Sequence, residues 1–270
     1  MKKVKVLSLV IVGVFFLNSA VLFSKDVAQL IKEGDELYVK GGEIYCIVPN
    51  CLDLWKQAME KYKEALKIDP NNYEAWWKLA RVYRQYGDEI QSRGILNNKP
   101  WKDITDKYAK LGMDAAQHAI KINPNRVEGW LMYGLNVGLH SDAVSVLTAL
   151  REGLKGKTQE ALEKAYKIDK DFDDGRPILA LGRFWTVLPW PLRKLSYGIK
   201  LLREGIATHG NGKWGTGGSY TFQLFLAEAL IKDGGSKNEA EAKKLLQEII
   251  QKCPVKITVY KAKKLLKELE

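Results

Sequence analysis

The sequence predicts an all-α fold in which antiparallel helix pairs stack into an α-solenoid that carries inserted segments. Two patterns indicate this class. One set of helical spacings recurs around a proline that ends the helix, and a second helical pattern follows that helix end. A chain of 270 residues with 46% apolar content is also long enough to bury a continuous core. The composition therefore fits an array of small helical repeats.

One recurring helix ends shortly before a proline. Three small or apolar residues precede Pro70 by 12, 8 and 5 positions, and the same offsets recur before Pro124 and Pro254, and before Lys170 and Gly210 without proline. Small outer residues let two helices approach closely, while the middle residue fills the gap. Proline stops the helix after the last apolar position. The residues are Ala58, Tyr62 and Ala65; Gly112, Ala116 and Ala119; Ala242, Leu246 and Ile249; Thr158, Leu162 and Ala165; and Gly198, Leu202 and Gly205.

A second helical pattern follows the end of such a helix. It consists of a large residue, then a leucine or aromatic residue, a small residue and a further large residue. The pattern is weaker after Asp173 than after Tyr73 and Val127. Both patterns together resemble the tetratricopeptide repeat (TPR), a helix-turn-helix unit of about 34 residues. The pattern residues are Trp76, Leu79, Ala80 and Tyr83; Trp130, Tyr133, Gly134 and Val137; and Arg176, Leu179, Ala180 and Arg183. The resemblance implies that Tyr62, Trp76, Tyr83 and Trp130 form the repeat core, with Pro70 and Pro124 ending helices.

Trp76 and Trp77 are neighbours in this pattern and point about 100° apart on a helix, so they cannot share one apolar stripe. Trp76 takes the core position. In TPR arrays, by resemblance, the face that carries Trp77 lines the concave groove. A tryptophan between arginines is typical of a binding hot spot; the alternative is that an inserted segment covers Trp77. The expected groove residues are Glu74, Trp77, Arg81, Arg84, Leu131 and Leu135.

Two insertions interrupt the repeat, where about nine positions are expected between the two helix patterns. Instead, 29 positions separate Tyr83 from Gly112, and 21 separate Val137 from Thr158. Glycine, asparagine and proline in the first insertion predict a loop around a short helix. Leucine spacing in the second predicts longer helices. Because insertions cluster on one face of a solenoid, they could wall off the groove into a pocket.

A Leu-Pro-Trp-Pro corner within residues 180–211 breaks the next helix. With the Leu-Gly-Arg helix before it and the Phe-Leu-Ala-Glu-Ala-Leu helix after it, this region resembles the TatT-type family of TPR proteins, which are associated with TRAP transporters in the bacterial periplasm. The resemblance covers residues 55–254, and its motifs are shared with a eukaryotic microtubule-regulator family. It implies a solute-binding protein as partner and an oligomeric state as an option. For Arg183, a bond to backbone carbonyls of this corner is favoured over a role as a groove cation.

The N-terminal part predicts export. Residues 1–24 combine three lysines with an apolar run, which is typical of a secretory signal peptide, with an uncleaved membrane anchor as the alternative. Residues 25–54 are expected to form an N-terminal helix and a cysteine-containing loop, and residues 55–270 the repeat domain. The chain would then be periplasmic or otherwise in the cell envelope, where Cys46 and Cys51 could form a disulfide. Cys253 is expected to be free and buried.

Catalytic and cofactor motifs are missing from the sequence. The histidines at 118, 140 and 209 lack metal-ligand spacing, and no known nucleophile motif is present. The formal net charge of +11 fits a lysine-rich solvated surface, and an exported chain makes nucleic acid a poor partner. We therefore expect binding without covalent chemistry, metal or cofactor. The first hypothesis is a scaffold for a protein partner; the alternative is a carrier of a small anionic or amphipathic ligand.

Overall fold

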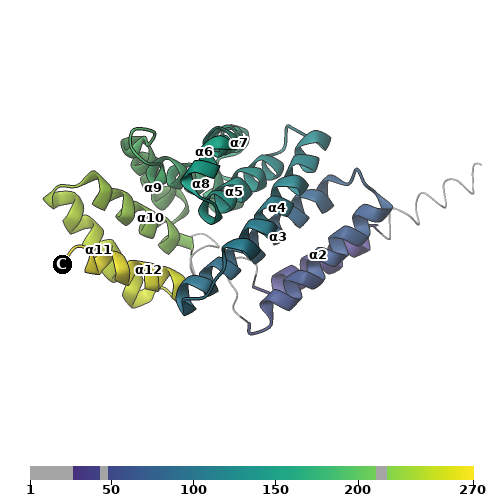
Figure 1. Ribbon diagram of the computed structural model, residues 1–270, viewed down its shortest axis with the longest axis horizontal. Coiled ribbons are helices and arrows are strands. Elements are labelled where there is room, and N and C mark those ends of the chain that lie inside the picture. The colour runs from purple at the N-terminus through teal and green to yellow at the C-terminus, as the bar shows by residue number, and fades with distance from the viewer. Residues whose placement is uncertain (1–26, 43–47, 211–217) are drawn as a thin grey trace, which may run out of the picture.

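The computed structural model describes residues 27–42, 48–210 and 218–270, and every regular element in these ranges is a helix. Residues 27–40 are helical and are followed by eleven labelled helices, which stack side by side into a curved array (Figure 1). The prediction of an all-α solenoid is confirmed. The helices are α2 Cys51–Ile68, α3 Tyr73–Asn97, α4 Lys102–Ile122, α5 Val127–Ala143, α6 Val146–Arg151, α7 Leu154–Ile168, α8 Phe172–Val187, α9 Leu195–His209, α10 Gly218–Asp233, α11 Ser236–Lys252 and α12 Lys256–Lys267.

The helices pack in consecutive pairs: α3 with α4, α5 with α7, α8 with α9, and α10 with α11. The first helices of successive pairs also contact one another, from α3 through α5, α8 and α10 to α12. One side of the array is therefore lined by α3, α5, α8, α10 and α12. Because α12 also contacts α3, the array curls until its last helix meets an early one.

The repeat register predicted from the sequence describes the packing between paired helices. All fifteen register residues of α2, α4, α7, α9 and α11 are buried. Glycines stand where helices approach most closely: a Cβ on Gly112 would lie 2.1 Å from Asn136, and one on Gly134 would lie 2.6 Å from Leu162. The small residues are thus required by close contact both within a pair, as between α5 and α7, and between consecutive pairs, as between α4 and α5.

The helix ends follow the proline pattern. α2 ends at Ile68, two residues before Pro70, and α4 ends at Ile122, two residues before Pro124. Tryptophans of the following helices secure these turns in the same way in both repeats. The indole Nε1 of Trp76 donates to the carbonyl oxygen of Pro70 at 2.8 Å, and that of Trp130 donates to the carbonyl oxygen of Pro124 at 2.8 Å.

The four aromatic residues predicted for the repeat core pack in or against the core. Tyr62 and Tyr83 are buried in it, whereas Trp76 and Trp130 are half-buried and pack against it. Trp76 stacks on His118 of α4, the helix paired with α3, with ring centres 4.3 Å apart. Trp76 therefore joins the two helices of this pair at the margin of the core.

The first insertion differs from its prediction. A loop around a short helix was expected, but the extra residues lengthen α3 and α4, and only residues 98–101 form the turn between them. The helix continues because Gly87 and Gly94 let it pass close to the neighbouring side chains: a Cβ on Gly87 would lie 2.8 Å from Leu139, and one on Gly94 would lie 2.5 Å from Trp101. Tertiary packing thus overrides the local preference of glycine, asparagine and proline for a loop.

The second insertion forms a separate helix. Its leucine spacing predicts longer helices, whereas the structure ends α5 at Ala143 and places the six-residue α6 before α7 begins at Leu154. The side chain of Ser145 caps α6 by accepting from the backbone N–H of Thr148 at 3.1 Å. Gly153, with a φ of +64°, turns the chain into α7, a conformation that favours glycine.

The described residues test the predictions for the N-terminal part only in part. The proposed signal or anchor segment 1–24 lies outside them, as does Cys46. Cys51 is disulfide-bonded and Cys253 is free and buried, as expected for Cys253, while the pairing of Cys46 with Cys51 stays a prediction. None of the helices in the described ranges is long and apolar enough to cross a membrane.

Candidate partner-binding groove

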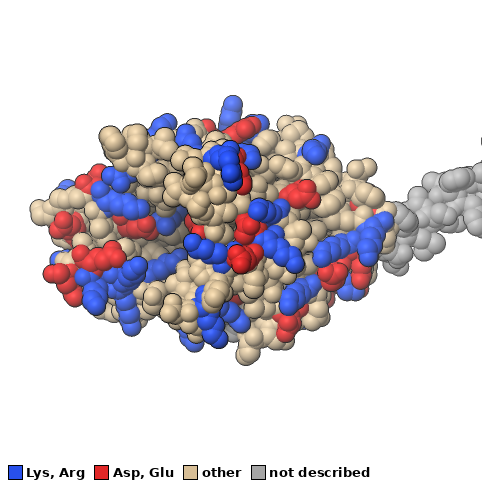
Figure 2. Space-filling model, viewed as in Figure 1, with Lys and Arg blue, Asp and Glu red and all other residues tan. Residues whose placement is uncertain are grey.

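The inner wall of the array, formed by α3, α5, α8, α10 and α12, is where the resemblance to TPR proteins places a groove. Figure 2 shows acidic and basic side chains mixed across the middle of the visible face. The expected groove residues Glu74, Trp77, Arg81 and Arg84 lie on α3, and Leu131 and Leu135 lie on α5. Their contacts decide which of them a partner could reach.

Trp77 is buried, which corrects its predicted placement as an exposed hot spot. Only 9% of the residue is exposed. Its Nε1 donates to Glu74 Oε2 at 2.8 Å, and the Arg81 guanidinium lies 4.9 Å from its ring centre. The same guanidinium lies 4.0 Å from the ring of Tyr38, which belongs to the helical segment 27–40. Arg81 and its contacts cover Trp77, in place of the inserted segment considered as the alternative.

Asp35 of segment 27–40 holds this segment to α2 and α3. It accepts hydrogen bonds from Tyr62 at 2.7 Å, Lys78 at 2.5 Å and Arg81 at 3.2 Å. Burial raises the pKa of Tyr62, so the phenol stays protonated and keeps donating. Arg81 is therefore engaged in a structural network, although its Nε has no hydrogen-bond partner among the described residues.

Glu74 joins α3 to α5. Arg126, which precedes α5, donates to Glu74 Oε1 at 2.6 Å and also pairs with Glu128. Tyr73 completes the link by donating to Glu128 Oε2 at 3.1 Å and accepting from the backbone N–H of Gly129 at 3.2 Å. This network fixes the spacing between successive helices of the inner wall. Glu74 thus has a structural role at the place where a binding role was expected.

The two expected leucines differ in access. Leu131 is fully buried in the core, so its predicted position on the groove surface is wrong for this structure. Leu135 is half-buried and packs against the core. The reason is the contact of α5 with both α3 and α8, which covers residues of this face. Leu135 keeps a partly open side, and its binding role stays a prediction.

A charged cluster from four helices lies deeper along the inner wall. Asp142 of α5 interacts electrostatically with Arg84 of α3, Arg183 of α8 and Lys261 of α12. Asp142 is solvent-exposed, yet the protein surrounding it raises its pKa, against the hydrogen bond from Gln91 and the three cations. Asp142 is thus an exposed carboxylate with three cations from three other helices around it.

Arg84 is the expected groove residue that this cluster contains. Its Nη1 lies 2.9 Å from Asp88 Oδ1, one turn further along α3, while its Nε has no hydrogen-bond partner among the described residues. Gln91, a further turn along, donates to Asp142 Oδ2 at 3.4 Å. The Arg84 side chain is 23% exposed but its Nε is buried, and its binding role stays a prediction.

Arg183 lies on α8 and pairs with an acidic side chain, and its role as a groove cation stays a prediction. It pairs with Glu228 Oε2 of α10 at 2.5 Å and lies 4.4 Å from the ring centre of Phe225. Lys232, and not Arg183, donates to a backbone carbonyl near the corner, that of Thr186 at 3.3 Å. Burial raises the pKa of Glu228, but Arg183 and Lys232 outweigh it and hold the pKa below its usual value.

Sequence reasoning missed the meeting of Asp142, Arg183, Glu228 and Lys261. These residues are spread over the chain from α5 to α12, and no spacing rule connects helices that meet only because the array curls. The one sequence signal for this cluster was the position of Arg183 on the first helix of its pair. The cluster is therefore a product of tertiary structure.

Of the three histidines, His140 is the buried one, and its contacts join three helical segments. His140 is 1% exposed, with Nδ1 against Asp106 and Nε2 2.8 Å from Glu152 of the α6–α7 turn. Both ring nitrogens are thus occupied, which fixes α6 to α4 and α5. No group of three or more potential metal ligands occurs among the described residues.

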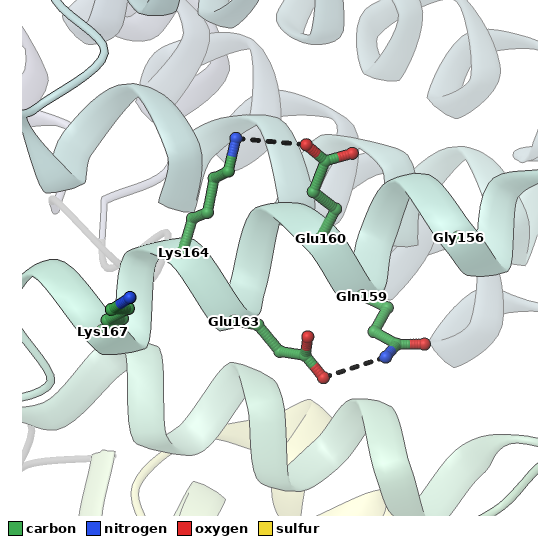
Figure 3. Close-up of a pocket in the computed structure, with 6 residues that line it drawn as sticks. All are labelled: Gly156, Gln159, Glu160, Glu163, Lys164 and Lys167. Carbon is green, nitrogen blue, oxygen red and sulfur yellow. Dashed lines mark hydrogen bonds and ion pairs between the residues drawn. The ribbon is translucent and has the colours of Figure 1, made fainter.

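A shallow hollow on the outer helix α7 is a weaker candidate (Figure 3). Its polar groups pair along the helix itself: Lys164 lies 3.2 Å from Glu160, and Gln159 donates to Glu163 at 3.0 Å. Because these contacts join side chains one turn apart, they leave no convergent set of groups for a ligand.

Comparisons with known proteins agree with the fold. A thermophilic TPR protein from Thermus thermophilus aligns with a TM-score of 0.57 and 14% identity, over 89% of this chain and 99% of that one. PilF of Pseudomonas aeruginosa aligns with a TM-score of 0.54 and 14% identity, over 92% and 90%. No curated protein matches the sequence significantly. The profile of one family matches residues 50–189, just over half of the sequence, so the chain belongs to the family described as Regulator of microtubule dynamics protein 1-3.

Proposed function

We propose that the chain is a TPR scaffold that binds a protein partner along its inner wall. The observation that carries this proposal is the cluster in which the exposed Asp142 and Lys261 come together with the partly exposed side chains of Arg84 and Arg183. A partner segment can donate to Asp142 and accept from Arg84 and Lys261. A mixed set of donors and acceptors favours a peptide, which carries both kinds of group in every residue.

The partner class follows from the resemblance to TatT-type proteins. We propose a solute-binding protein of a TRAP-type transporter, met in the periplasm or elsewhere in the cell envelope. The apolar run in residues 1–24 supports export, and the fold supports a scaffold. The family's description points to a different partner class, microtubules, for its named members.

The test is capture from native cell envelopes with gentle crosslinking, followed by measurement of Kd with the identified partner. Variants Arg84→Glu and Asp142→Lys reverse one charge each in the cluster, and Glu163→Lys on the outer helix α7 is the matched control. Trp77→Ala is unsuitable, because Trp77 is buried and its loss would disturb folding. We expect each cluster variant to weaken Kd about tenfold or more, as for a buried charged contact, and the control to bind normally.

Equal binding by all variants would refute the groove assignment. Capture of tubulin in place of a solute-binding protein would replace the proposed partner while leaving the groove in place, provided the cluster variants lose it. Circular dichroism of each variant checks that a loss of binding is not a loss of fold.

A small-ligand carrier is the second candidate, favoured by the convergence of Arg84, Arg183 and Lys261 and by the contact of α12 with α3, which narrows the array. Cations from three helices suit an anionic group. Native mass spectrometry of freshly purified protein would show a bound molecule that Arg84→Glu loses. If no bound molecule is detected, and none of a set of organic acids raises the melting temperature of the protein, this candidate is excluded.

A further inference from the structure

Helix α6 exposes an apolar face that the inner groove does not explain. Val146 is 72% exposed, Leu147 75% and Leu150 61%, and no residue of α6 is buried. These three side chains lie at i, i+1 and i+4, which places them on one side of the helix. Exposed aliphatic clusters of this kind mark interaction surfaces in proteins that stay in solution.

A second exposed apolar group lies at the Leu-Pro-Trp-Pro corner between α8 and α9. Trp190 is 80% exposed, and Val187 and Leu192 are each 40% exposed. Among the described residues, the four most exposed large hydrophobic side chains are Trp190 and the three of α6. The structure therefore concentrates its open apolar surface in two turns.

The two turns lie on the same edge of the array. Lys155, at the start of α7 just after α6, lies 5.6 Å from the ring centre of Trp185, and Lys194 of the corner lies 4.3 Å from the same ring. The backbone N–H of Lys194 also donates to the carbonyl of Trp185 at 3.2 Å. Trp185 thus lies between the start of α7, which follows α6, and the corner. Figure 2 shows a largely uncharged area over α6 and α8, with both basic and acidic side chains at its borders.

The charged residues within the two segments that carry this apolar surface are nearly all basic. Glu152 is the only acidic residue in segments 144–157 and 187–200, and it is engaged with His140. The basic residues in the two segments are Arg151, Lys155, Lys157, Arg193, Lys194 and Lys200. A convex apolar surface surrounded by lysine and arginine, with tryptophan at its margin, has the composition of segments that lie in a membrane interface.

We propose that α6 and the Trp190 corner together dock the protein on an anionic lipid bilayer. The side chains of Val146, Leu147, Leu150 and Trp190 enter the interface, and the surrounding lysines and arginines contact anionic headgroups. A bilayer fits better than a protein partner because the apolar groups protrude from two convex turns and do not line a hollow. This inference is independent of the proposed groove function, since it rests on the apolar side chains of α6 and the corner and not on Asp142 or the cations around it.

The experiment measures the depth of single fluorophores in the full chain. An environment-sensitive label is attached at Leu147→Cys, Trp190→Cys or Ile168→Cys in a Cys253→Ser background. Ile168 is the matched control, because it is 40% exposed at the far end of α7, about 20 Å along the helix from α6. The probes are vesicles of phosphatidylcholine alone or mixed with phosphatidylserine. Label depth reports on this edge even if residues 1–24 also bind the vesicle.

We expect the labels at positions 147 and 190 to shift to the blue and to be quenched by bilayer-depth quenchers on phosphatidylserine vesicles, with little change at position 168. The exposed pair Arg151→Glu and Lys157→Glu should reduce this response about tenfold at a given lipid concentration. Circular dichroism confirms that the variants are folded.

Labels at 147 and 190 that stay solvent-exposed on phosphatidylserine vesicles would overturn the proposal. An equal response on phosphatidylcholine alone would overturn its anionic specificity. If both labels become shielded without lipid, and light scattering shows a dimer, the occupant of the surface is a second copy of the chain and the lipid assignment is wrong.

Discussion

Replacing Gly112 by alanine tests whether the helix approach predicted from the repeat register limits stability. A Cβ at position 112 would lie 2.1 Å from Asn136 Oδ1 and 2.4 Å from its Cγ, closer than atoms can pack. Asn136 is fully buried, and its Nδ2 donates to the carbonyls of Met132 at 2.8 Å and Ala80 at 3.3 Å. The amide cannot turn away without giving up these bonds, so α4 and α5 must separate.

The magnitude follows from a comparison with Gly138, which lies inside α5 and has open space, with no atom within 4 Å, where a Cβ would stand. Both glycines are in helices, so both changes to alanine gain about 1 kcal/mol of helix propensity. At Gly138 this gain stands alone. At Gly112, overpacking costs about 1–3 kcal/mol. The free energy of unfolding of Gly112→Ala should therefore lie about 1–3 kcal/mol below that of Gly138→Ala.

The assay is urea unfolding followed by far-ultraviolet circular dichroism, with the wild type and both variants under one set of conditions. Gly134→Ala adds an internal scale, since its Cβ would meet the movable side chain of Leu162 at 2.6 Å. It should fall between the other two. Equal unfolding free energies for Gly112→Ala and Gly138→Ala would refute the reasoning that close helix contact requires glycine at 112.

Two further predictions concern charge and the disulfide. Because the pKa of Glu228 is lowered in the folded state, ionised Glu228 should stabilise the fold above its unfolded pKa of about 4.3, and this stabilisation should be lost as pH falls through the lower folded pKa. The difference in unfolding free energy between wild type and Glu228→Gln, measured by urea titration, should therefore close between pH 7 and pH 2. A difference that persists would contradict the pairing with Arg183. Peptide mapping of unreduced protein should recover Cys46 linked to Cys51, with Cys253 alkylated only after unfolding; a Cys51 peptide linked elsewhere would disprove the predicted pairing.

The fold was largely readable from the sequence because each repeat specifies itself by local spacing. The register of Ala58, Tyr62 and Ala65 recurs in later helices, and every register residue is buried. Pro70 follows the end of its helix as expected, and α7 ends at Ile168 without any proline. Such patterns depend on contacts between neighbouring helices, so they can be recognised without knowledge of the rest of the molecule.

The groove was less readable because exposure depends on neighbours that are distant in sequence. Trp77 lies on the face that a bare repeat would leave open, but Arg81 covers it after bonding to Asp35, more than forty residues earlier. Leu131 is covered because α5 packs against both α3 and α8. In each case the contacts across helices determined what remained accessible.

By itself, the sequence determined that this chain forms stacked helix pairs, where most helices end and which small residues the pairs need at their contacts. These properties depend on helical periodicity and on steric limits within one or two turns. Only the tertiary structure decided that α12 returns to α3, that Asp142 meets Arg84, Arg183 and Lys261, and that α6 lies with the Trp190 corner on one edge. The physical reason is the accumulated curvature of the array: small rotations between successive pairs, which no local pattern encodes, bring distant side chains together.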